Sequence, residues 1–139
     1  MKIDVSVFEN AIKQTEKSRT FLRSELAQKN GELYEQFRAA SIQAFKYTYE
    51  RALKMLRRQL DQIVVNPSEL REMAFMDFIR TAYGAGLVRE VSVFKTYREK
   101  RNITAHTYDA HKAEEILEVL DSFLQDVRYI LDELKKRNP

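Results

Sequence analysis

The sequence predicts an all-α fold, an antiparallel up-and-down bundle of four main helices with one additional short helix. The 139 residues include only three glycines and two prolines, so few positions disfavour a helix. The chain is rich in Glu, Lys, Arg, Leu and Ala, and its apolar residues recur at three- and four-residue steps. A chain of this length buries about two thirds of its unfolded surface, so we expect residues 1–139 to form a single domain.

The first helix is expected to start after Asp4, an N-cap residue type, and to end at Asn30-Gly31. Asparagine and glycine tolerate the left-handed conformation that closes a helix, so a tight turn and an antiparallel second helix should follow. The apolar positions that define the inward face of this first helix are Phe8, Ile12, Leu22 and Leu26.

The second helix is predicted over residues 32–63, with a broad apolar stripe that includes Tyr47 as a core residue. Its polar side carries four cations, Lys46, Lys54, Arg57 and Arg58. A charge run of this kind usually forms a solvated face, and contact with RNA is the alternative.

A third helix should begin with Asn66 as its cap and Pro67 at its first position, and should continue to about Tyr83. Residues 84–86, Gly-Ala-Gly, would end it. This Gly-x-Gly follows a helix and lacks a third glycine or a lysine, so a helix terminus is the better interpretation than a phosphate-binding loop.

Two further helices are expected, over about residues 90–102 and from about Ala110 to the last apolar positions, with residues 135–139 fraying into solvent. Arg101 and His106 lie five positions apart and would point about 140° apart on one unbroken helix. The helix should therefore bend or end between them. The capping residue type Asp109 fits a new start after the interruption.

The candidate functional side chains lie in residues 101–108, where Arg101, His106 and Tyr108 occur together. Arginine is a permanent planar cation suited to phosphate oxygens, and histidine is the residue type that exchanges protons near neutrality. Such a pair can cleave or hold a phosphodiester without a metal. The alternative for Arg101 is a cation that only complements the helix dipole. His111, outside this block, is interpreted as a surface residue.

Several classes of function are excluded or disfavoured. The 24 basic and 21 acidic residues leave a formal charge of only +3, which does not by itself indicate nucleic acid. The chain has no cysteine and only two histidines, which disfavours a zinc site, and it lacks dinucleotide, P-loop and nucleophile-elbow motifs, so we expect no metal and no cofactor. Without a long apolar run, we expect a soluble cytoplasmic protein with no membrane contact.

The R-x4-H-x-Y pattern of residues 101–108 resembles the signature of HEPN (higher eukaryotes and prokaryotes nucleotide-binding) domains. Residues 45–56 have the pattern F-x-Y-T-Y-E-x-A-x-K-x-L, which is similar to a block of the nucleotidyltransferase substrate-binding branch of that family. The two blocks occur in the family's order in a chain of the family's length, so the resemblance covers essentially the whole protein.

The resemblance implies a homodimeric, metal-independent ribonuclease toxin in which Arg101 and His106 of two subunits share one cleft. It implies that Asn102 and Glu50 assist at the substrate, although Glu50 is also compatible with simple solvent exposure. The implied partner is a minimal nucleotidyltransferase antitoxin, encoded nearby, that transfers AMP to Tyr108. The chain itself lacks the Gly-Ser and paired-Asp block of those enzymes.

Two alternatives to the ribonuclease remain open at this point. The same fold and cleft could serve a non-catalytic subunit that presents a nucleotide or another substrate to the nucleotidyltransferase, with Arg101 as a phosphate clamp. A purely structural helical adaptor is disfavoured by the polar block between two helices.

Overall fold

The chain is entirely helical in the computed structural model, which describes residues 1–139. The predicted all-α class is confirmed, and no helix combines the length and apolar composition that a bilayer crossing needs. In chain order the elements, which include one 3₁₀ turn (η1), are α1 (Ser6–Leu22), α2 (Glu25–Lys29), α3 (Gly31–Asp61), α4 (Pro67–Glu72), α5 (Phe75–Gly84), α6 (Val93–Asn102), η1 (Thr104–His106), α7 (Ala110–Leu117) and α8 (Leu120–Arg137).

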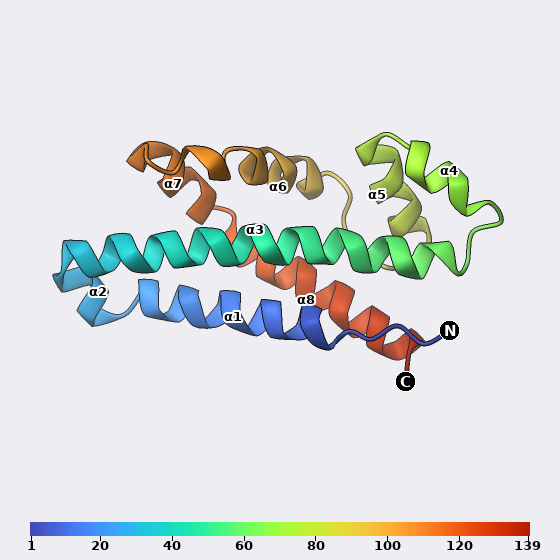
Figure 1. Ribbon diagram of the computed structural model, residues 1–139, viewed down its shortest axis with the longest axis horizontal. Helices are drawn as coiled ribbons and strands as arrows, with labels where there is room; N and C mark the ends of the chain where they lie inside the picture. Colours follow the sequence, from blue (N-terminus) through green and yellow to red (C-terminus); the bar gives the residue numbers. More distant parts are fainter.

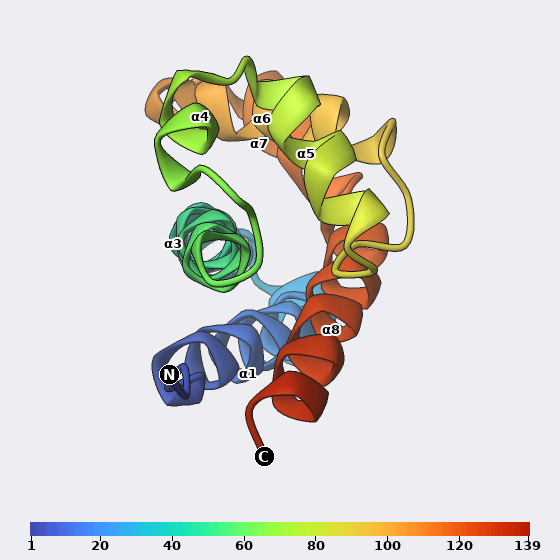
Figure 2. The same ribbon diagram turned by 90° about the vertical axis from the view of Figure 1, so that its right-hand side faces the viewer.

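The long helix α3 is the axis of the molecule, and the other helices pack around it (Figure 1). Helix α1 runs antiparallel along one side of α3, whereas α6 and α7 form a hairpin along the opposite side. Seen along α3, helices α1, α8, α5 and α6 form an arc around it (Figure 2). The hairpin therefore lies on the opposite side of α3 from α1.

Three of the predicted helices are each divided in two. The first one breaks at Arg23-Ser24, because the Ser24 hydroxyl caps α2 by accepting a hydrogen bond from the Ala27 backbone N–H at 3.2 Å. The break changes which residues face inward, so Ala27 is buried while Leu26 is 61% exposed. The prediction that Leu26 belongs to the core was wrong for this reason.

The other two divisions have different local causes. The predicted third helix is interrupted at Met73-Ala74, where both residues adopt extended backbone, so α4 and α5 are separate helices. The predicted last helix is interrupted at Glu118-Val119, where the Val119 N–H bonds the Ile116 carbonyl three residues back. This tight turn separates α7 from α8.

The turn at Asn30 also differs from the prediction. Asn30 has φ −135°, and its side chain caps the start of α3 by accepting from the Glu32 and Leu33 backbone N–H groups. Only Gly86 has a positive φ, +78°, where α5 gives way to the following loop. The turn at Asn30 is tight and needs no left-handed residue, but it joins α2 to α3. Helices α1 and α3 are antiparallel as predicted, and α2 lies between them in the chain.

The C-terminal tail does not fray as predicted. Helix α8 continues to Arg137, and the Asn138 side chain accepts from the Ile3 backbone N–H at 2.9 Å. The same amide group donates to the Gln59 side chain at 2.9 Å. Asn138 thereby fixes both chain ends to α3.

An aromatic cluster joins α3, α6 and α8 in the core. Phe123 of α8 packs edge to face against Phe45 of α3 and Tyr97 of α6, with ring centroids 4.7 and 5.3 Å away. The Tyr97 hydroxyl donates a hydrogen bond to the buried Asp126 carboxylate, which also accepts from Arg89 Nε at 2.7 Å. Burial and the Asp126 carboxylate raise the pKa of Tyr97, so its phenol remains a donor.

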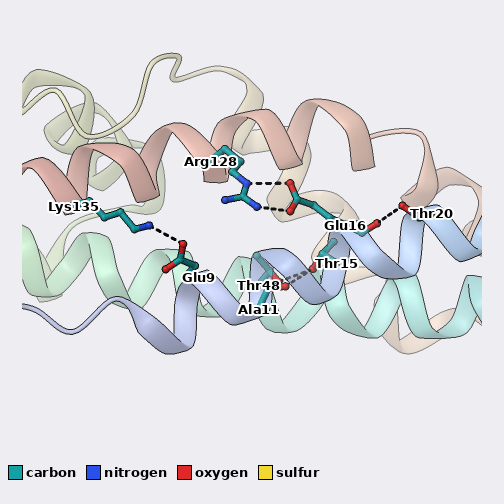
Figure 3. Close-up of polar contacts among 8 residues, drawn as sticks. All are labelled: Glu9, Ala11, Thr15, Glu16, Thr20, Thr48, Arg128 and Lys135. Carbon is teal, nitrogen blue, oxygen red and sulfur yellow. Dashed lines mark hydrogen bonds and ion pairs between the residues drawn. The ribbon is translucent and has the colours of Figure 1, made fainter.

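Polar contacts fix α1 to its neighbours (Figure 3). The buried hydroxyls of Thr15 and Thr48 lie 2.8 Å apart, so each is satisfied inside the α1–α3 contact. On the α8 side, Glu16 accepts two hydrogen bonds from Arg128. These contacts join α1 to both α3 and α8.

We predict that Asp126→Ala lowers the free energy of unfolding by about 2 kcal/mol, because Tyr97 and Arg89 both lose a charged acceptor. Urea unfolding measures the change. Asp132→Ala on the same helix is the matched control, since Asp132 is exposed and makes no ion pair. Equal effects of the two substitutions would show that the buried carboxylate contributes nothing specific.

Candidate functional site

The Arg101 to Tyr108 block lies where α6 turns into α7, and the interruption predicted between Arg101 and His106 is confirmed. Helix α6 ends at Asn102, and η1 follows. The Thr104 hydroxyl donates to the Arg101 carbonyl at 2.7 Å, which satisfies a backbone group that the end of the helix leaves free. Asp109 then caps α7 through the His111 and Lys112 N–H groups, as the sequence predicted.

Arg101 is held from α3 by Glu50. Nη2 of Arg101 lies 3.0 Å from Oε1 of Glu50, in an ion pair whose side chains are 36% and 48% exposed. Only one of the three guanidinium nitrogens is engaged in this pair, so the others remain free for a ligand. Glu50 is therefore half-exposed and at the same time orients the arginine of the block.

His106 and Tyr108 both lie on the surface. Their rings approach edge to face with centroids 6.0 Å apart, and Tyr108 is 85% exposed. The imidazole of His106 makes no hydrogen bond within the chain, and Asn102 is exposed without a side-chain hydrogen bond. The structure does not bring Asn102 into hydrogen-bond contact with His106.

The prediction that Tyr47 belongs to the core was wrong. Tyr47 is 47% exposed, whereas Tyr49 is 4% exposed and belongs to the core. Burial raises the pKa of Tyr49 to about 12, in spite of the nearby Arg98 and Arg101 guanidinium groups, so Tyr49 stays neutral beneath the site. The buried face of α3 includes Tyr49, and Tyr47, two positions earlier, points away from it.

Arg51 was not singled out from the sequence. Its guanidinium lies 5.5 Å from the centre of the Tyr47 ring, and its Nη2 donates to the Tyr47 hydroxyl at 3.2 Å. The sequence signal for this contact was the spacing of four positions between Tyr47 and Arg51, since residues i and i+4 meet on a helix. This exposed pair adjoins Glu50 in the sequence.

His111 is a surface residue, as predicted, with a side chain that is 85% exposed and 3.3 Å from Glu115. No group of three or more potential metal-binding side chains forms in the structure. A hollow of about 1100 Å³ between α1 and α8 contains none of the residues of the Arg101 to Tyr108 block. The site is therefore an open surface with one oriented cation and one free imidazole.

The structure defines a class of protein: an α-helical domain packed around one long helix, with the Arg101 to Tyr108 block at the end of α6. The family model for nucleotidyltransferase substrate binding protein like domains matches residues 4–136. The chain therefore belongs to this family, as its two sequence blocks indicated.

Two relatives from Haemophilus influenzae are similar over most of this chain. One is named probable ribonuclease HepT and is 40% identical over 100 residues, which cover 72% of this chain and 68% of the relative. The other is a solved structure described as revealing the fold of a substrate binding domain of a nucleotidyltransferase. It aligns with a TM-score of 0.91 at 30% identity, covering 95% of this chain and 99% of that one.

We predict that His106→Ala and Tyr108→Phe each change the free energy of unfolding by less than about 0.5 kcal/mol, because both side chains are exposed and unbonded. Urea unfolding is the measurement. A loss above about 1.5 kcal/mol would mean that the side chain supports the fold. This result decides whether loss of function in these variants can be attributed to chemistry.

Proposed function

We propose that this chain is the toxin of a two-gene toxin–antitoxin module, a metal-independent endoribonuclease that uses Arg101 and His106. The observation that carries the proposal is that the R-x4-H-x-Y block combines an arginine oriented by Glu50 with an exposed imidazole that makes no hydrogen bond. The relative named probable ribonuclease HepT supports it.

Cleavage of RNA requires removal of the ribose 2′-hydroxyl proton, stabilisation of a dianionic phosphorane and protonation of the leaving 5′-oxygen. His106 serves as general base or acid, because its ring nitrogens are free. Arg101 supplies donors to the developing charge with the nitrogens that Glu50 does not engage. Glu50 and Asn102 act at the substrate, Glu50 by fixing the guanidinium and Asn102 as an exposed amide one residue away.

A homodimer completes this proposal. One histidine cannot easily take the proton of the 2′-hydroxyl and donate one to the leaving oxygen at the same moment. The site of one subunit is open, with His106 exposed and without an internal partner. A second copy placed against this surface would supply the second imidazole and enclose the phosphate between the two sites.

Regulation is proposed at Tyr108. A partner nucleotidyltransferase would join the phenol oxygen to the α-phosphorus of ATP, with pyrophosphate as the leaving group and loss of the phenol proton. The ring is 85% exposed and 6.0 Å from that of His106, so it is accessible to a partner enzyme. AMP placed there adds bulk and negative charge beside the cation and the imidazole, which would block RNA.

The second candidate is a non-catalytic subunit that presents a nucleotide or another substrate to a nucleotidyltransferase. The description of the aligned structure as a substrate binding domain favours it. In this function Arg101 would clamp a phosphate and His106 would only bind. Both candidates use the same surface and differ in whether a bond is broken.

We predict that the wild-type chain cleaves RNA in the presence of EDTA and that His106→Ala lowers the rate at least about 100-fold. Gel electrophoresis of end-labelled RNA measures the rate. Arg101→Lys keeps the charge but loses the planar fork of donors, so its rate should also fall. Cleavage that persists in His106→Ala would reject the ribonuclease, and tight nucleotide binding without any cleavage would favour the second candidate.

We also predict that incubation with the partner nucleotidyltransferase and ATP adds the mass of AMP to the chain and that Tyr108→Phe abolishes the addition. Intact-mass spectrometry with peptide mapping measures both. Tyr83→Phe is the matched control, because Tyr83 is also exposed but belongs to α5. AMP found on another residue would contradict the assignment of Tyr108.

A further inference from the structure

The middle of α3 has an unusual charge composition. Residues 36–60 contain six cations and one acid, and that acid, Glu50, is already paired with Arg101. Elsewhere in the chain many cations have carboxylate partners, as Arg128 does with Glu16 and Arg19 and Arg23 do with Asp121. The cations of α3 that make no ion pair are Lys46, Arg51, Lys54, Arg57 and Arg58.

These unpaired cations continue across α5 and onto α6. The Arg57 guanidinium lies over the Phe78 ring at 5.0 Å, and that of Arg98 lies over the Phe75 ring at 4.7 Å. Arg98 also makes no ion pair, and it precedes Arg101 by one helical turn. We call the surface formed by Arg51, Lys54, Arg57, Arg58 and Arg98 the basic face.

The basic face is unfavourable for the isolated chain. Lys54 lies three or four positions from Arg51, Arg57 and Arg58, and like charges at these spacings repel and destabilise a helix. The net charge of the chain is only +3, so the concentration of unpaired cations is a local property. An anionic partner would remove the repulsion between these cations, so the cluster favours the binding of an anion.

The residue types of the basic face suit a phosphate chain. The Phe78 and Phe75 rings lie under the Arg57 and Arg98 guanidinium groups, and a guanidinium held by a ring keeps N–H donors that can bind phosphate oxygens. Exposed aromatic rings lie at the end nearest the site, Tyr47 beside Arg51 and Tyr108 beside His106. Single-stranded nucleic acid is recognised by this combination of cations along the backbone and aromatic rings for unstacked bases.

We propose that the basic face binds the backbone of single-stranded RNA and directs it to Arg101 and His106. The inference deepens the proposed function, since it assigns a substrate with several phosphates on both sides of the reacting bond. A free nucleotide would contact only Arg101 and would not extend over the basic face. Binding to the face requires the cations and is independent of whether His106 performs chemistry.

The test uses the full-length chain with His106→Ala, so that binding of a fluorescent single-stranded RNA is measured without cleavage. In that background Arg51→Gln, Lys54→Gln and Arg58→Gln are combined. Loss of three phosphate contacts should raise Kd at least tenfold and should lower the slope of log K against log salt by about 2. The combined variant should remain folded, because it removes like-charge repulsion from α3.

The matched control combines Lys2→Gln, Lys13→Gln and Lys17→Gln, which removes the same charge from exposed, unpaired lysines of the N-terminal segment and α1. Its Kd should change less than about threefold. Equal losses in the two triple variants would overturn the basic face as a specific surface. Tighter binding to phosphatidylserine vesicles or to an acidic peptide than to RNA would also overturn it.

Cleavage assays keep this inference separate from the proposed function. With His106 restored, the three α3 substitutions should reduce cleavage of a long RNA while the control triple does not. If the α3 variant loses RNA binding and wild type never cleaves, the RNA-binding role of the basic face is supported and the ribonuclease function is rejected. If the α3 variant binds and cleaves like wild type, the RNA-binding role of the basic face is rejected and the ribonuclease function is supported.

Discussion

The packing of α6 against α3 and α8 is the constraint on which the candidate site depends. Phe123 contacts Phe45 and Tyr97 in one aromatic cluster, and Asp126 accepts a hydrogen bond from Tyr97 beneath it. Tyr97 lies one turn of helix before Arg101, so these buried contacts fix the position of the Arg101 backbone relative to α3. The Glu50 ion pair then selects the direction in which the guanidinium points.

The end of α6 divides the site into a fixed part and an accessible part. Arg101 belongs to the last turn of a packed helix and is held from α3, whereas His106 and Tyr108 follow on a short turn with exposed rings. A cation that is already oriented loses little entropy when a phosphate binds. Exposed rings are accessible to a second molecule. A continuous helix would place Arg101 and His106 on different sides and would separate these two roles.

Charge has two different physical uses in this molecule. Between α1 and α8, pairs such as Glu16–Arg128 and Glu9–Lys135 join helices, and each cation has a carboxylate close to it. The Lys135 hydrogen bond holds the pKa of Glu9 below its usual value, so this contribution to stability is present at neutral pH and is lost as the pH falls through the lowered pKa. The cations of the basic face lack such partners. The same residue types therefore stabilise the fold on one side and remain available for a ligand on the other.

The sequence by itself determined the helical class, the caps at Asn66 and Asp109, the end of α5 and the interruption between Arg101 and His106. These features depend on local backbone chemistry, which acts within a few residues and can be read along the chain. It also placed the chemically useful residues in one block, because their types and spacing are visible without a fold. The pairing of Arg101 with Glu50 was only one of two interpretations of Glu50, and the ion pair crosses 51 positions of sequence.

Only the tertiary structure decided the remaining features. Packing placed Tyr49 and not Tyr47 in the core, although the two residues belong to the same sequence block. The contacts of Asn138 with Ile3 and Gln59 fixed a tail that composition alone assigns to solvent. The physical reason is common to both, because burial and long-range hydrogen bonds depend on which segments meet in space. Local periodicity constrains which face of a helix is apolar but does not specify the neighbour that covers it.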